Sequence, residues 1–190
     1  MNTLLSVLLG VGLSAACGFR IFVPLLLVGI AARTGHVALG TSFAWMASTP
    51  ALIALGVATV LEVGAYYLPW LDHVLDVVAT PAAVVAGMLM TASVVTGLDP
   101  MLKWTLALIA GGGIAGTVQA LTVGTRKVSL LTTGGLGNPL VSTVELIGSV
   151  FLTILAIALP LLAFAVIAWA LFFGVRHLLR LMGGAGKASA

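Results

Sequence analysis

The chain has 190 residues, of which 61% are apolar and only 7% are charged, and its mean hydropathy is +1.26. A soluble domain of this length needs more polar surface, so the composition excludes one and predicts an integral membrane protein. The net charge of +3 comes from few residues. Most of the basic residues lie at the ends of apolar runs, which indicates membrane topology and not nucleic-acid binding. They are Arg33, Arg126, Lys127, Arg176, Arg180 and Lys187.

The first apolar stretch is interrupted. Residues 3–33 are almost wholly apolar, but the small-residue segment 15–18 is followed by Arg20 and Pro24. These interruptions favour a broken helix, re-entrant or spanning, over one straight span. A polar loop is expected at 34–49.

A cleaner span follows this loop. Pro50 opens it, because proline is favourable at a first helical position, and the span carries Glu62 and ends at Pro69. The segment 70–76 begins with tryptophan and places polar side chains on one helical face, which predicts a short helix at the membrane interface. Another span is expected at 81–97.

The second part of the chain follows the same order. Residues 101–125 are apolar but contain the glycine cluster 111–116, and we expect a second broken element there. A polar, glycine-rich loop is predicted at 126–138. The apolar run 139–182 would reach about 66 Å as one straight helix, twice the bilayer thickness, so it must bend, and Pro160 is the expected place.

The two parts resemble a duplication. Segments 57–64 and 141–148 are similar in sequence, and each carries a glutamate. We therefore predict an all-α membrane domain over the whole chain, built from two related halves, 1–97 and 98–183, with a flexible tail at 184–190.

Two topologies remain open. If both broken elements are re-entrant hairpins, the basic residues fall on one side of the membrane, which the positive-inside rule makes cytoplasmic. If the broken elements cross the membrane, each half has three crossings and the repeats are inverted. In the first case these residues share a side: Arg33, Lys103, Arg126, Lys127, Arg176 and Arg180.

Glu62 and Glu145 are the first candidate site residues. A charged side chain at the centre of a membrane helix costs roughly 2.5 to 3.5 kcal/mol on insertion scales, so it normally faces a partner or a watery cavity. A two-fold arrangement would bring both carboxylates to one cavity, where they could share protons or a cation. The alternative is a neutral glutamate that hydrogen-bonds a neighbouring helix.

Arg20 follows the break after Gly18. In a re-entrant hairpin its guanidinium lies close to the start of a half-helix, where an anion would be held. Its alternative role is a salt bridge to Glu62 or Glu145. Either role places Arg20 near a glutamate.

Three further polar residues are candidates for ion or solute binding. Thr133 and Asn138 belong to the glycine-rich loop, whose backbone could line a cavity, although Asn138 is also suited to cap the helix that follows. Gln119 could line a path or simply make one interhelical hydrogen bond. The nearby spacing from Gly112 to Gly116 is typical of close helix packing or dimerisation.

Enzyme signatures are missing from the sequence. It contains no zinc-protease, nucleophile-elbow or Walker pattern, so we expect neither an enzyme nor a cofactor. Asp72, His73 and Asp76 resemble a metal cluster, but on an interfacial helix they are more simply its wet face. Cys17 is the only cysteine, which excludes an internal disulfide and a cysteine-cluster metal site, and we predict no metal site.

The segments 18–24, 61–69 and 133–139 carry a resemblance that covers nearly the whole chain. In them the protein resembles an uncharacterised family of small bacterial multi-pass membrane proteins, domain of unknown function 4126. The resemblance implies a bacterial inner-membrane location and no mechanism.

The leading functional hypothesis is therefore a small transporter or channel for an ion, a proton or a small charged solute. We expect it to work as a homodimer in the lipid bilayer, because so small a chain has little internal surface to enclose a pathway. The alternatives are a non-transporting scaffold or accessory subunit, or a lipid-head-group binder or flippase. Water-filled space around the glutamates would favour transport, and a dry, fully paired charge cluster would favour the scaffold.

Overall fold

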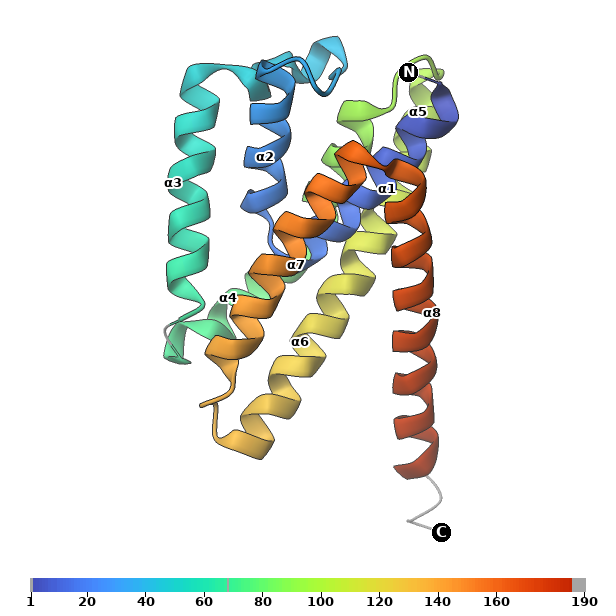
Figure 1. Cartoon of the computed structure of the whole chain (residues 1–190). Coiled ribbons are helices and arrows are strands. Elements are labelled where there is room, and N and C mark those ends of the chain that lie inside the picture. The colour runs from blue at the N-terminus through green and yellow to red at the C-terminus, as the bar shows by residue number, and fades with distance from the viewer. Residues whose placement is uncertain (1, 68, 186–190) are drawn as a thin grey trace.

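The computed structural model describes residues 2–67 and 69–185, with side chains outside 69–76, 175 and 177–185. Every regular element in these ranges is helical, which confirms the predicted all-α fold for this part of the chain (Figure 1). The elements are α1 (Thr3–Phe19), α2 (Phe22–Arg33), the 3-10 helix η1 (Thr41–Ala47), α3 (Thr49–Ala65), α4 (Pro69–Val94), α5 (Pro100–Leu106), the π-helical η2 (Ala107–Gly112), α6 (Gly113–Thr133), α7 (Asn138–Ala158) and α8 (Pro160–Ala185).

Three helical segments in the described ranges are long and apolar enough to cross a membrane: Val77–Val94, Pro100–Thr133 and Asn138–Ala158. The pair formed by η1 and α3 passes the same criterion together but bends by 65°, and it would make a fourth. Crossing the hydrocarbon core takes about 20 apolar residues. The chain is therefore a helical membrane protein.

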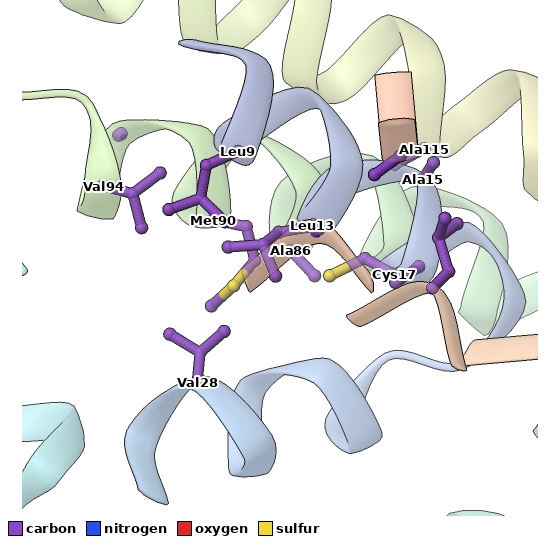
Figure 2. Packing of buried hydrophobic residues seen from close by; sticks show 14 of the residues in the cluster. Leu9, Leu13, Ala15, Cys17, Val28, Ala86, Met90, Val94 and Ala115 are labelled. Carbon is purple, nitrogen blue, oxygen red and sulfur yellow. The ribbon is translucent and has the colours of Figure 1, made fainter. Parts of the chain in front are cut away.

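Helix α1 is the core of the bundle. It packs against α4, α6, α7 and α8, and its residues are buried almost continuously from Leu8 to Gly18. Figure 2 shows Leu9, Leu13 and Cys17 of this helix among side chains from its neighbours. Since α1 is surrounded by other helices, its apolar character reflects packing inside the protein.

Glycines allow these helices to approach closely. A Cβ added at Gly12 would lie 2.6 Å from the Cβ of Ala156 in α7, and one at Gly18 would lie 2.6 Å from the carbonyl oxygen of Ala115 in α6. Contacts this short leave no room for a side chain, so backbone contact between small residues holds α1 in place.

The predicted packing motif of Gly112, at the end of η2, and Gly116, in α6, also acts within the chain. Cβ atoms added at Gly112 and Gly116 would lie 3.2 and 3.0 Å from the side chain of Val84 in α4. These glycines therefore accommodate a neighbouring helix of the same molecule.

The chain breaks between α1 and α2, as the sequence predicted. Arg20 has an extended backbone, with φ −145° and ψ 135°, and its N–H donates to the carbonyl of Ala16. The two short helices diverge from this break like the arms of a V, and the N-terminal end of α1 and the C-terminal end of α2 lie towards the same end of the molecule (Figure 1).

The second predicted break, in 101–125, is wrong. From Pro100 to Thr133 the chain is one helical run in which the glycine cluster forms the π-helical segment η2. A Cβ at Gly111 would lie 2.6 Å from the carbonyl oxygen of Gly87, so this position needs glycine for η2 to lie directly against α4. The glycines permit close packing of η2 on α4 and do not end the helix. The predicted loop at 126–138 is shorter than expected, because α6 continues to Thr133 and α7 begins at Asn138, which leaves only residues 134–137 between them.

Other boundaries were predicted in part. The interfacial helix and the following span are one helix, α4, which contains Pro81. The loop at 34–49 holds η1, and Ser48 caps α3 by accepting a hydrogen bond from the N–H of Ala51 at 3.3 Å. The expected bend at Pro160 is confirmed, because α7 ends at Ala158 and α8 returns in the opposite direction (Figure 1).

The basic residues do not gather at one end of the molecule, which is the arrangement that two re-entrant hairpins would give. Arg33 ends α2 and Lys103 lies in α5, at one end of the molecule, whereas Lys127 lies in the half of α6 that approaches the other end (Figure 1). The physical reason is the continuous 100–133 helix, which carries the chain across the molecule where a hairpin would have returned it.

Candidate functional site: a buried charge cluster

The turn between α6 and α7 sets the register of the cluster. Its first two glycines have φ of 62° and 90°, values that favour glycine, so a tight turn at 134–137 is possible. Arg126 lies seven residues before the last residue of α6, Thr133, and Glu145 lies seven after the first residue of α7, Asn138 (133 − 126 = 145 − 138 = 7). Both residues are therefore about 10 Å from the turn, opposite one another.

Two arginines bind Glu145. The Nε of Arg126 donates to Oε1 at 3.1 Å, its Nη2 donates to Oε2, and the Nη2 of Arg20 lies 3.3 Å from the same Oε2. All three residues are buried, with 2%, 4% and 2% of Arg126, Glu145 and Arg20 exposed. The prediction that Arg20 lies beside a glutamate is confirmed, and Arg126 is a further partner.

Tyr66 joins the cluster from the C-terminal end of α3. The guanidinium carbons of Arg20 and Arg126 lie 4.0 and 3.9 Å from the centre of its ring, within the range of cation–π attraction. The Nη2 of Arg20 also donates to the carbonyl of Ser142 at 3.0 Å, and the hydroxyl of Ser142 donates to the carbonyl of Tyr66 at 3.4 Å. The cluster thus ties together α1, α3, α6 and α7.

Glu62 belongs to α3, and its side chain lies against the start of α2. Its two carboxylate oxygens accept hydrogen bonds from the backbone N–H groups of Ile21 and Phe22 at 2.7 and 3.0 Å. The first N–H groups of a helix have no partner within the helix and carry a partial positive charge. Glu62 therefore accepts hydrogen bonds from N–H groups at the start of α2 that would otherwise lack a partner. The first of these N–H groups, that of Ile21, directly follows Arg20 in the chain.

The formal charges of these groups balance. Counted as ionised groups, Arg20 and Arg126 contribute two positive charges, and Glu62 and Glu145 contribute two negative charges. Burying an unpaired ion is costly, which explains why the four groups occur together.

Hydrogen bonding at Arg20 is incomplete. Its Nε and Nη1 are buried and have no hydrogen-bond partner among the described residues. Buried polar groups are nearly always hydrogen-bonded, and exceptions need an explanation such as a ligand or water. Arg20 therefore keeps donors available at the α1–α2 break.

A cavity of about 550 Å³ reaches the cluster from between α1, α6, α7 and α8. Glu145, Thr122 and Thr125 are the polar parts of a lining that is otherwise apolar or glycine. The volume lies in the usual range of small-molecule sites. The space beside Glu145 suits a molecule with a large apolar part better than a fully hydrated ion.

The remaining predicted site residues take other positions. Asn138 is buried at the first turn of α7, and the prediction that it is the N-cap is wrong, because Gly137 precedes the helix in that role and makes no side-chain cap bond. Thr133 is exposed and stabilises the turn, since its hydroxyl accepts from the N–H of Gly137 at 2.9 Å. Gln119 is buried in α6.

The side chains of residues 72, 73 and 76 lie outside the described set, so their predicted solvent-facing position stays a prediction.

Sequence reasoning missed Arg126 and Tyr66. Arg126 was interpreted as a charge at the end of an apolar run, and Tyr66 as part of the span that carries Glu62. A signal for Arg126 was present, because the glycine-rich segment 134–137 lies midway between it and Glu145. A tight helical hairpin centred there pairs the two residues.

The helices and their buried cluster define this chain as a helical membrane protein with an internal charged site. Its sequence matches the profile described as "Domain of unknown function (DUF4126)" over residues 7–180, and the chain belongs to that family. The match includes Arg20, Glu62, Arg126 and Glu145. No curated protein and no solved structure matches the chain.

Proposed function

We propose that this protein is a small transporter or channel that moves a small charged solute across the membrane, and that the solute binds at the charge cluster. The observation that carries the proposal is Arg20. It is buried at a chain break, its Nη2 binds Glu145 and Ser142, and two of its donors have no partner among the described residues. If the ion pair were purely structural, we would expect the remaining donors of the buried arginine to be hydrogen-bonded as well.

The broken first element supports this function. Non-helical backbone at membrane depth is tolerated where it lies within protein or lines a cavity, and transporters use the ends of half-helices in this way. Helices α1 and α2 have 17 and 12 residues, and each is shorter than the roughly 20 residues that a helix needs to cross the hydrocarbon core. We infer that they form a re-entrant pair with Arg20 at its tip.

The directions of the other helices support a related pair of halves. Helices α2, α3 and α4 alternate in direction, and α6, α7 and α8 do so in the opposite sense (Figure 1). In each set the glutamate of the middle helix contacts the helix before it, Glu62 on α2 and Glu145 on α6. We infer an inverted repeat, an arrangement typical of transporters that alternate access to a central site.

The apolar cavity favours a second candidate, binding of an amphipathic molecule such as a lipid. Its volume and lining would accept an apolar chain, and Glu145 and two threonines would face a polar group. The scaffold hypothesis draws its support from the arginines that hold Glu145, but it leaves the unpartnered donors of Arg20 unexplained.

We further propose that the protein lies in a bacterial inner membrane, works as a homodimer and converts no substrate chemically. The small size of the chain supports association, because one copy offers little surface to enclose a path.

The test is flux through liposomes that contain the full chain. Protons, alkali cations, simple anions and a fluorescent lipid would be followed separately, with Glu145→Gln against Asp99→Asn as the matched control. Asp99 caps α5 through the N–H of Met101 on an exposed surface, and asparagine caps equally well. Flux of a small solute that is lowered by Glu145→Gln, in protein shown to be folded, and left unchanged by Asp99→Asn supports the proposal. Lipid movement alone supports the second candidate, and an absence of all flux contradicts transport.

A further inference from the structure

The start of α2 has the chemistry of an anion site. Its first N–H groups point at a carboxylate, that of Glu62, through bonds of 2.7 and 3.0 Å to Ile21 and Phe22. Helix N-termini bind anions because free N–H groups and the helix dipole act together. Here the ligand is a side chain of the protein itself, and it shows where the oxygens of a bound anion would lie.

A second feature lies at the same chain break. Arg20, one residue before Ile21, is almost fully buried and keeps its Nε and Nη1 without a partner among the described residues. An arginine offers five N–H donors and cannot lose its charge under ordinary conditions. Two donors of Arg20 therefore lack an acceptor among the described residues, and an anionic ligand would supply one.

The charge balance points in the same direction. With Glu62 in place, the formal charges of the two arginines and two glutamates cancel. If the Glu62 carboxylate withdraws, one uncompensated positive charge remains on the arginines, together with about half a charge at the start of α2. A small anion restores the balance.

Glu62 can withdraw without opening the core. It belongs to α3, in which all residues are described and none is buried, and which packs mainly on α2 and η1. Its own side chain is only partly buried. Glu145, by contrast, lies inside the bundle and is held by two arginines. The two glutamates therefore differ in role, one fixed and one displaceable.

We propose that the start of α2 together with Arg20 is an anion-binding site, that Glu62 occupies it as an internal ligand, and that the solute is a small anion that replaces Glu62. The identification of the solute rests on the proposed transport function, whereas the existence of the binding site does not.

Calorimetric titration of the purified full chain in detergent tests the site. Sodium chloride, sodium nitrate and sodium phosphate would be titrated at constant ionic strength, made up with gluconate, into the wild type, Glu62→Gln and Glu62→Ala. At least one of these anions should bind about tenfold more tightly to the Glu62 variants, because the competing carboxylate is gone. Two Glu62 variants are used so that a folding defect in one does not decide the outcome.

Arginine variants in the Glu62→Gln background provide the matched comparison. Arg20→Gln should abolish the gain in affinity, whereas Arg33→Gln should retain it. Arg33 is exposed at the other end of α2 and donates to the hydroxyl of Thr49 at 2.8 Å. Unchanged or weaker anion binding in both Glu62 variants overturns the site, and so does a gain that survives Arg20→Gln.

Flux separates the two proposals. Tighter anion binding in the Glu62 variants without flux through liposomes leaves the site standing and contradicts transport. Flux of protons or alkali cations, with no anion bound by any variant, leaves transport standing and overturns the anion site.

Discussion

Substitution of Glu145 by glutamine tests the energetics of the buried cluster. The change removes one negative charge and keeps the shape of the side chain. It leaves Arg20 and Arg126 cationic, each only 2% exposed, with no carboxylate between them. Removing one partner of a buried ion pair costs roughly 3–5 kcal/mol, and here two arginines lose the same partner.

The arginine variants should cost less than Glu145→Gln. After Arg126→Gln, Glu145 keeps Arg20 at 3.3 Å, and after Arg20→Gln it keeps both bonds to Arg126. We expect about 1–3 kcal/mol for each, the usual cost of losing one buried hydrogen-bonding partner. Replacing all three residues by apolar ones of similar size should recover most of the lost stability, since buried ion networks often exchange for apolar side chains at little cost.

Cys17 supplies the assay. It is the only cysteine in the chain and is fully buried in α1. A maleimide therefore labels it when the bundle unfolds, and labelling across a denaturant series in detergent gives the free energy of unfolding. If Glu145→Gln unfolds within about 1 kcal/mol of the wild type, or costs less than either arginine variant, the charge cluster does not hold the bundle as described.

Three further predictions concern packing, the aromatic contact and the start of α2. Gly18→Ala should destabilise the chain by about 1–3 kcal/mol in the same assay, because its Cβ would meet a backbone oxygen at 2.6 Å, whereas Gly113→Ala, with open space around it, should be neutral or slightly stabilising. An equal effect at both positions contradicts the close packing of α1. Tyr66→Leu should cost about 1–2 kcal/mol more than Tyr66→Phe, which keeps the ring beneath both guanidinium groups, and equal costs would remove the cation–π contribution. Glu62→Ala should speed amide hydrogen exchange at Phe22, whose N–H loses its acceptor, and unchanged exchange there refutes the described hydrogen bond.

The sequence predicts best where the cause is local or compositional. Low charge and long apolar runs predict a helical membrane protein, and the small residues before Arg20 predict the break after α1. Pro160 predicts the bend between α7 and α8, because an apolar run of that length cannot continue straight through a bilayer. The cost of a lone charge among apolar residues predicts that Arg20 lies near a glutamate.

Prediction fails where a residue has more than one physical use. The glycines at 111–113 were expected to break a helix, but they let η2 lie against α4, which depends on a partner 24 residues away, Gly87 (111 − 87 = 24). Pro81 was expected to start a helix and lies within one. Arg126 lies at the end of an apolar run, where a basic residue usually indicates topology. It is a site residue because the length of the following turn places it opposite Glu145.

Comparison of Arg20→Gln with Arg33→Gln in liposome flux tests the central claim most directly. Both changes remove one arginine from the α1–α2 region, but Arg20 lies in the buried cluster and Arg33 lies at the exposed end of α2. With both variants folded by the Cys17 criterion, the account predicts that anion flux falls at least tenfold in Arg20→Gln and stays at the wild-type rate in Arg33→Gln, in line with the loss of about 1.4 kcal/mol or more of solute binding. Wild-type flux in Arg20→Gln would contradict the claim that the solute passes through the cluster.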